Sequence, residues 1–310
     1  MRSDLKDRFK KVIAALVCGS ALIGMSGCML FDKTDYEMTD AGILLCRALK
    51  RHDAEEILDL DLDEADARKA ELRNDLNFSE NGPYMPGTAS AYDSICATMR
   101  YHIEDGSVEL SSNKKSGEAT FIFEFKDYKE VRRHRDNMSD PVTFTAALAA
   151  SDDIDEVEVT MEFEYSGGEW KVTNFNEVYD AVFSFLGEEF EFISPLQGKI
   201  RSLEWQNSER YEAYAYYSNA TSIELDLTPI GHDEGWDDVF YVVTFSDDGT
   251  EEHATRVYTG DATLNAVYGT SQGADMTGSA MREGYYTITF LDGYGTVLDS
   301  STCYVVNYSY

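Results

Sequence analysis

The sequence predicts an α+β fold with two folded parts, in which helices and an antiparallel sheet come first and an all-β sandwich follows. The spacing of apolar residues carries this prediction. Apolar residues first recur every three to four positions, as in amphipathic helices, and then every second position, as in strands. From residue 199 onward almost no helical spacing remains. We therefore expect one domain over residues 36–190, a linker over 191–198 and a second domain over 199–310.

The N-terminus has the pattern of a secretion signal. Five basic residues in the first eleven positions precede an apolar run. The run has about fifteen residues, which matches the hydrophobic region of a signal peptide and is too short to cross a bilayer comfortably. The sequence therefore predicts a signal peptide at residues 1–27 and a short tether at 28–35.

The apolar run ends in Met25-Ser26-Gly27-Cys28. This motif resembles the lipobox of bacterial lipoproteins, in which small residues precede an obligatory cysteine. The resemblance implies that the Cys28 thiol carries a diacylglyceryl group and that the chain is cut before Cys28. It also implies an extracytoplasmic protein held on the bacterial membrane, because two or three acyl chains anchor a protein where one binds only marginally. An ordinary signal peptide with an incidental cysteine is the alternative.

The composition is strongly acidic. The chain has 26 Lys+Arg against 58 Asp+Glu, a formal net charge of −32. Such a surface repels nucleic acid and anionic lipid headgroups, so we expect no nucleic-acid partner and contact with the membrane only through the lipid. At 43% hydrophobic residues, the chain can fill ordinary cores, and its length suits two domains better than one.

The first domain is expected to open with helices and close with a meander of strands. A first helical stripe contains Ala41, Leu44, Leu45, Ala48 and Leu49, and a later one contains Tyr92, Ile95, Cys96, Met99 and Ile103. Alternation then indicates strands with one buried face, with Phe121, Phe123 and Phe125 on one and Val157, Val159, Met161, Phe163 and Tyr165 on the other. A Gly-Gly turn leads into Glu169-Trp170-Lys171-Val172, and a helical stripe follows from Phe175.

This element order and the closing Gly-Glu-Trp-Lys-Val hairpin resemble the nuclear-transport-factor-2-like, or cystatin-like, α+β roll found in many bacterial lipoproteins. The resemblance implies a curved sheet that wraps helices into a cone able to bind small molecules. Some relatives are isomerases or dehydratases that use an Asp or His inside the cone. Here His52 and His102 are the only histidines near the helices, and no Asp–His spacing argues for acid–base chemistry.

The second domain is expected to be a sandwich of short strands. Alternating segments are separated by Asn, Asp and Gly turns, and the clearest hairpin runs through Tyr286, Ile288 and Phe290 and back through Tyr304 and Val306. The domain resembles a bacterial immunoglobulin-like module on strand count and this final hairpin. It lacks the Cys…Trp…Cys core of antibody domains.

The second domain also holds the candidate binding residues. Thirteen of the twenty tyrosines lie there. Their rings and one tryptophan could stack on sugars or form interface hot spots, and the candidate face consists of Tyr211, Tyr214, Tyr216, Tyr217 and Trp236. A cell-wall glycan or another envelope protein would be the partner. The alternative is that tyrosines in strands only reflect β propensity and half-burial.

The cysteines and acidic runs offer little chemistry. Cys46 and Cys96 fall on two predicted helices of one domain and form a candidate disulfide, since the chain is expected outside the cytoplasm. The alternative is that both are small core residues.

The acidic run from Asp59 lacks the glycine and the glutamate of a calcium-binding EF-hand loop, so we expect no metal. The sequence has no phosphate-binding glycine loop, nucleophile elbow or zinc spacing, and we expect no cofactor.

These observations favour a non-enzymatic binding module at the cell envelope. One alternative is a small-molecule-binding lipoprotein that uses the cone of the first domain. The other is an enzyme of the isomerase or dehydratase type, which would need an inward-facing Asp or His in that cone with a perturbed pKa.

Overall fold

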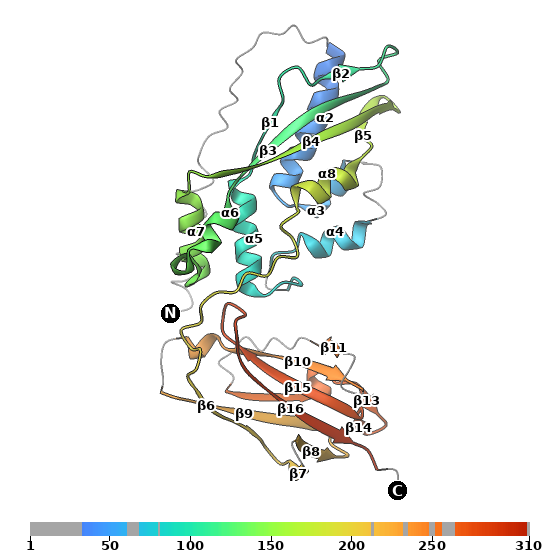
Figure 1. Ribbon diagram of the computed structural model, residues 1–310. Helices are drawn as coiled ribbons and strands as arrows, with labels where there is room; N and C mark the ends of the chain where they lie inside the picture. The colour runs from blue at the N-terminus through green and yellow to red at the C-terminus, as the bar shows by residue number, and fades with distance from the viewer. Residues whose placement is uncertain are drawn as a thin grey trace. The chain divides into compact units, whose positions relative to one another are not determined.

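The structure is a computed structural model. It describes residues 33–60, 68–79, 81–211, 214–231, 235–247, 252–255 and 264–308. The α+β class predicted from the sequence is confirmed (Figure 1).

The chain forms two compact units. The first comprises the described residues up to Phe78 together with Tyr92–Tyr128 and Leu148–Gly187. The second comprises Ser79–Ala91, Lys129–Ala147 and Glu188–Tyr310. The second unit thus takes two stretches from within the range that the sequence assigned to the first domain.

The described helices are α2 (Lys33–Lys50), α3 (Ala54–Asp59), α4 (Lys69–Asp75), α5 (Pro86–Thr98), α6 (Tyr128–Arg133), α7 (Pro141–Ala150) and α8 (Phe175–Val182). Three of them, α3, α5 and α7, begin at residues that favour a helix start. Asp53 caps α3, because its carboxylate accepts hydrogen bonds from the backbone N–H groups of Glu55 and Glu56 at 3.0 and 3.1 Å. Both α5 and α7 open on a proline, whose missing N–H costs nothing in the first turn.

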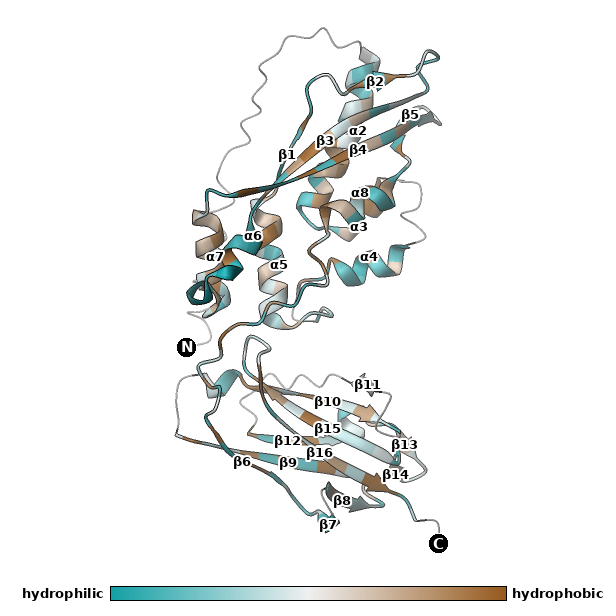
Figure 2. Cartoon of the chain, in the orientation of Figure 1, coloured by the Kyte–Doolittle hydropathy of each residue, from teal (hydrophilic) through white to brown (hydrophobic). Residues whose placement is uncertain are grey.

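The first unit is built on a curled antiparallel sheet. Its strands are β1 (Arg100–Ile103), β2 (Glu109–Leu110), β3 (Ser116–Lys126), β4 (Ile154–Ser166) and β5 (Glu169–Val172), in the order β1-β3-β4-β5 with β2 beside β3. Phe121 lies opposite Val159 and Phe123 opposite Val157, which aligns the apolar sides of the two long strands. Hydrophobic and hydrophilic residues alternate along both (Figure 2). The predicted alternation and strand pairing are therefore confirmed.

Two details of the first unit differ from the sequence-based expectation. The second helical stripe was expected to reach Ile103, but α5 ends at Thr98 and the chain from Arg100 pairs with β3 as strand β1. In α2 the buried side is rotated slightly, so that Met38 and Gly42 face the core while Leu44 is 40% exposed. Packing on the sheet accounts for this rotation, because Gly42 lies against the rings of Phe121 and Phe163.

Helix α2 lies against the sheet at Gly42. A Cβ atom at this position would overlap the ring of Phe121 and stand 3.0 Å from the ring of Phe163. Both rings are buried, as are those of Phe123 and Phe175. The inner side of the curled sheet is therefore filled by the unit's own aromatic rings.

The second unit contains the sandwich. One sheet has the order β11-β10-β15-β16-β8-β7, and a smaller one has the order β12-β9-β6. The first is formed by β7 (Glu209–Tyr211), β8 (Tyr214–Ser218), β10 (Phe240–Ser246), β11 (Glu252–Thr255), β15 (Gly284–Leu291) and β16 (Val297–Val306). The second is formed by β6 (Ile200–Trp205), β9 (Ser222–Pro229) and β12 (Asn265–Gly269), and β13 (Met276–Thr277) pairs separately with β14 (Ala280–Met281).

The predicted final hairpin is β15–β16. Its turn is closed by the buried Asp292, whose Oδ1 accepts hydrogen bonds from the backbone N–H groups of Tyr294 and Thr296, each at 2.9 Å. Strand β8 then joins the other side of β16 in parallel orientation. The hairpin and β8 together form the centre of the larger sheet.

Polar side chains tie the two sheets together across the core. The Tyr241 hydroxyl donates to the Val267 carbonyl at 2.6 Å, and the Trp205 indole donates to the Ser301 hydroxyl at 2.8 Å. Each bond joins a strand of one sheet to a strand of the other. These two bonds therefore fix the position of one sheet relative to the other.

We predict that Gly42→Val destabilises the first unit. The added side chain must displace the rings of Phe121 and Phe163, and overpacking of this kind costs about 1–3 kcal/mol. Leu44→Val on the same helix is the control, since it introduces the same residue at an exposed position and should cost less than about 0.5 kcal/mol. Urea unfolding of both variants measures the difference, and equal losses of stability would contradict the close packing at Gly42.

Candidate functional site

Five tyrosines gather on the outward side of the larger sheet in the second unit. Tyr214 and Tyr216 come from β8, Tyr285 from β15, Tyr304 from β16, and Tyr308 from the segment after β16. Tyr285 pairs with Tyr304, and Tyr304 pairs with Tyr216, so three rings form a row across three adjacent strands. We call these five residues the tyrosine face.

The rings of the tyrosine face touch one another. The centroids of Tyr285 and Tyr304 are 4.8 Å apart, and those of Tyr214 and Tyr285 are 5.7 Å apart. Tyr216 stacks on Tyr304 at 6.2 Å with an interplanar angle of 26°. These distances lie in the range of favourable aromatic pairs. The face is therefore one continuous aromatic surface.

Hydrogen bonds hold the rim of this surface in place. The hydroxyls of Tyr216 and Tyr308 are 2.5 Å apart, and the backbone N–H of Tyr308 donates to the Asn219 side chain at 3.0 Å. The Tyr304 hydroxyl donates to the Glu283 carboxylate at 3.1 Å. Tyr214 and Tyr308 remain 46% and 51% exposed, and the other three rings are half-buried. The rings are thus fixed in position while parts of their surfaces face solvent.

These contacts also raise the pKa of two of the hydroxyls. The hydrogen bond to Tyr308, with some burial, raises the pKa of Tyr216 to about 12. Burial, together with the bond to Glu283, raises the pKa of Tyr304 above its ordinary value. A neutral phenol both donates and accepts hydrogen bonds. Tyr216 and Tyr304 can therefore offer a ligand both a ring and a neutral hydroxyl.

The structure divides the binding face expected from the sequence. Tyr214 and Tyr216 lie on the tyrosine face, but Tyr217 and Trp236 are each only 6% exposed and belong to the sandwich core. Tyr217 points inward because it follows Tyr216 in the same strand, and its hydroxyl donates to the Gln206 carbonyl at 2.6 Å. Tyr211 ends β7, opposite Tyr214, and its side chain lies outside the described residues.

Sequence reasoning did not find Tyr285, Tyr304 and Tyr308 as parts of this site. The final hairpin contained a signal from which Tyr285 and Tyr304 could have been identified. Once Tyr286 is assigned to the core, Tyr285 must face outward, and the hairpin register places Tyr304 beside it. The parallel pairing of β8 with β16, which brings Tyr216 to the same row, has no local signal in the sequence.

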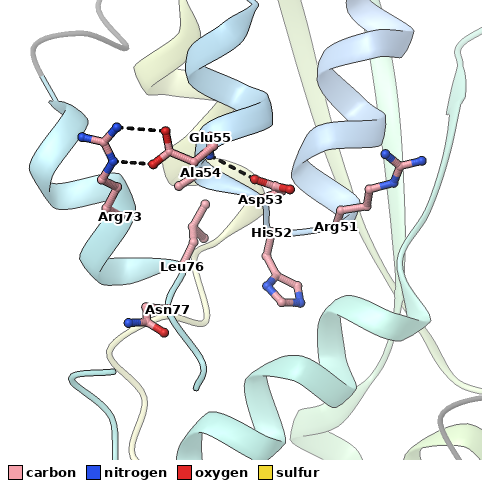
Figure 3. A pocket seen from close by; sticks show the side chains of 8 residues that line it. All are labelled: Arg51, His52, Asp53, Ala54, Glu55, Arg73, Leu76 and Asn77. Carbon is pink, nitrogen blue, oxygen red and sulfur yellow. Dashed lines mark hydrogen bonds and ion pairs between the residues drawn. The ribbon is translucent and has the colours of Figure 1, made fainter. Parts of the chain in front are cut away.

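A second candidate is a shallow hollow of about 510 Å³ in the first unit, at the ends of α2, α3 and α4 (Figure 3). It is lined by Arg51, His52, Asp53, Ala54, Glu55, Arg73, Leu76 and Asn77. Its two arginines are paired: Arg73 with Glu55 at 2.5 and 2.9 Å, and Arg51 with Glu56 at 3.0 Å. These ion pairs neutralise the positive charge of the hollow.

One residue that lines the hollow, His52, forms an Asp–His pair that sequence spacing did not reveal. His52 Nε2 lies 3.1 Å from Asp93 Oδ1, and the imidazole contacts the Phe78 ring, with centroids 4.7 Å apart and the ring planes tilted by 36°. His52 has a φ of 43°, the left-handed conformation in which the chain turns out of α2. The other histidine of interest, His102, lies 52% exposed on β1, 3.6 Å from Glu124. Among the described residues, no group of three His, Cys, Asp or Glu side chains is arranged to hold a metal ion.

The three cysteines in the described part of the chain are buried free thiols. Burial raises the pKa of Cys46, Cys96 and Cys303 above the ordinary value for a thiol. This arrangement matches the alternative in which Cys46 and Cys96 are small core residues. Cys28 and the expected signal peptide lie outside the described residues.

We predict that the adjacent tyrosines of β8 respond oppositely to loss of the hydroxyl. Tyr217→Phe removes the buried hydroxyl that donates to the Gln206 carbonyl and should cost about 1–3 kcal/mol of unfolding free energy. Tyr216→Phe loses a bond at the surface and should cost less than about 0.5 kcal/mol. Urea unfolding of the two variants tests this, and a larger cost for Tyr216→Phe would mean that the assigned inward and outward sides are reversed.

No protein-family model matches the chain, and no curated protein matches it. The resemblances to lipoproteins, to the cystatin-like roll and to immunoglobulin-like modules therefore stay predictions. No helix in the described ranges is long and apolar enough to span a membrane. The function must be argued from the residues of the site.

Proposed function

We propose that this protein is a lipid-anchored, non-enzymatic binding protein of the bacterial cell envelope, and that the tyrosine face is its binding surface. One observation carries the proposal: four tyrosine rings form a chain of contacts on the outward side of one sheet, and Tyr308 joins them through its hydroxyl. Tyr214 and Tyr308 are about half exposed. Tyrosine is enriched at binding hot spots because its large rigid ring offers contact area and its hydroxyl offers a hydrogen bond.

The first unit gives less support to the alternative of a small-molecule site. The inner side of its sheet is filled by buried rings, among them Phe121, Phe123, Phe163 and Phe175. Helix α2 sits directly on these rings at Gly42. A ligand inside the cone would have to displace these side chains.

The alternative of an isomerase or dehydratase rests on the His52–Asp93 pair alone. His52 of that pair lines an open hollow whose arginines are already paired with glutamates, and the side chain of Asp93 is 48% exposed. An acid–base enzyme gains most from a group inside a cavity that excludes water. The tyrosine face is therefore the stronger candidate.

The lipid anchor is proposed from the Met25-Ser26-Gly27-Cys28 motif. The chain's net charge of −32 supports an anchor that holds the folded units off the membrane, since anionic headgroups repel such a surface. An extracytoplasmic location follows from the same motif. Both units would then be exposed to the partners present in the envelope.

We predict that Cys28→Ser abolishes lipid attachment. A serine hydroxyl does not accept the diacylglyceryl group that the lipobox cysteine receives as a thioether. Metabolic labelling with a radioactive fatty acid should mark the protein and not the Cys28→Ser variant. Cys18→Ser is the control and should behave as the original chain. Labelling of the Cys28→Ser variant would contradict the proposed anchor.

We predict that the double variant Tyr285→Ala/Tyr304→Ala loses binding to the envelope. The full chain in detergent would be incubated with detergent-extracted envelopes from a host strain lacking its gene, and the bound fraction measured by sedimentation. Removing two central rings breaks the row and should reduce binding at least tenfold.

Two controls separate binding from folding. Tyr36→Ala removes a tyrosine that is 65% exposed on α2 and should leave binding unchanged. Tyr285→Phe/Tyr304→Phe keeps both rings and should keep most of the binding. If the double alanine variant binds envelopes as strongly as the original chain, the tyrosine face is not the binding surface.

A further inference from the structure

We propose that the ligand of the tyrosine face is an uncharged glycan chain. This inference rests on the proposed function, because it names the class of ligand that the same face would bind. It is carried by what surrounds the rings rather than by the rings alone.

On the three adjacent strands that carry the rings, the outward positions carry mostly hydroxyl groups and no charge, and the nearest carboxylates, those of Glu283 and Glu209, lie outside these positions. The outward positions of the three central strands are Tyr214, Tyr216 and Ser218 on β8, Tyr285, Thr287 and Thr289 on β15, and Ser300, Thr302, Tyr304 and Val306 on β16. None of these ten positions is charged, in a chain whose residues are 27% charged. This strip of the surface is therefore electrically neutral, although the protein as a whole is acidic.

The sheet of the first unit shows that this neutrality is not a general property of the chain. Its outward positions on β4 include Glu156, Glu158, Glu162 and Glu164. Two of them lie opposite further glutamates, since Glu162 pairs with Glu118 and Glu156 with Glu124. Both sheets face solvent on one side, yet only one of them is covered with carboxylates.

The neutral strip matches the chemistry of a sugar ring. One face of a pyranose consists of C–H groups and packs on an aromatic ring, while its edge carries hydroxyls that need donors and acceptors. Tyr216, Tyr285 and Tyr304 supply consecutive rings with centroids 4.8 and 6.2 Å apart. Beside them, Thr287 and Thr302 supply two hydroxyls that lie 2.8 Å apart.

Other classes of ligand fit less well. A cationic ligand would be held by carboxylates among the rings, but Glu283 lies at the rim, bound to the Tyr304 hydroxyl, and Glu209 lies opposite Tyr216 on the outermost strand. An anionic ligand would need Arg or Lys, which the ten outward positions lack. A protein partner commonly uses arginine in its hot spots, together with tyrosine and tryptophan. The ten outward positions offer such an arginine no carboxylate.

The test uses glycans released from envelopes after complete protease digestion and separated by anion exchange into a neutral and an acidic pool. Each pool would compete for the binding of the full chain, in a detergent without a sugar headgroup, to extracted envelopes. We expect the neutral pool to displace the chain. Binding of the active neutral fraction, measured by calorimetry, should fall at least tenfold in Tyr285→Ala/Tyr304→Ala and stay unchanged in Tyr36→Ala.

Each other outcome overturns the inference in a distinguishable way. Competition by the acidic pool alone would mean a charged glycan. Competition by neither pool, with envelope binding destroyed by protease, would mean a protein partner, and in both cases the proposed function would survive. Envelope binding that does not depend on Tyr285 and Tyr304 would remove the proposed function and the inference together.

Discussion

The second unit depends on the strict alternation of its tyrosine-rich strands. Tyr216 and Tyr217 are neighbours in β8, as are Tyr285 and Tyr286 in β15, and in each pair the first ring faces solvent and the second enters the core. A slip of one residue would exchange the two sides completely. The buried hydroxyls oppose such a slip, because those of Tyr217 and Tyr241 bond to carbonyls of the opposite sheet at 2.6–3.2 Å. The same register that fills the core therefore assembles the outer surface.

The first unit uses its aromatic residues in the opposite way. Its rings point inward, where helix α2 covers them, and the helix comes close only because residue 42 is glycine. Its outer sheet surface is covered with glutamates. Opposed like charges across strands cost stability, and the surface can carry them because solvent and salt screen exposed charge. The unit is thus well packed inside and strongly hydrated outside, which suits a soluble support better than a ligand-binding cone.

The sequence predicted what depends on local spacing and missed what depends on long-range pairing. Period-two alternation gave β3, β4 and the β15–β16 hairpin, since the residues that alternate are neighbours in the chain. It could not give the parallel pairing of β8 with β16, which joins segments almost ninety residues apart. For the same reason Tyr214 and Tyr216 were identified from their own cluster, whereas their partners Tyr285 and Tyr304 were not. His52 and Asp93, 41 residues apart, were missed likewise.

The arrangement of the tyrosine face also bears on how tightly it could hold a ligand. Ordering a free side chain on binding costs about 0.5–1.5 kcal/mol, and a tyrosine has few rotatable bonds to begin with. Here Tyr216 is already held by Tyr304 and Tyr308, and Tyr304 by Glu283, so much of that cost has been met during folding. A flat, preformed and uncharged surface gains little from any single contact. It suits a long ligand that makes several similar contacts in a row, which is the property of a repeating chain.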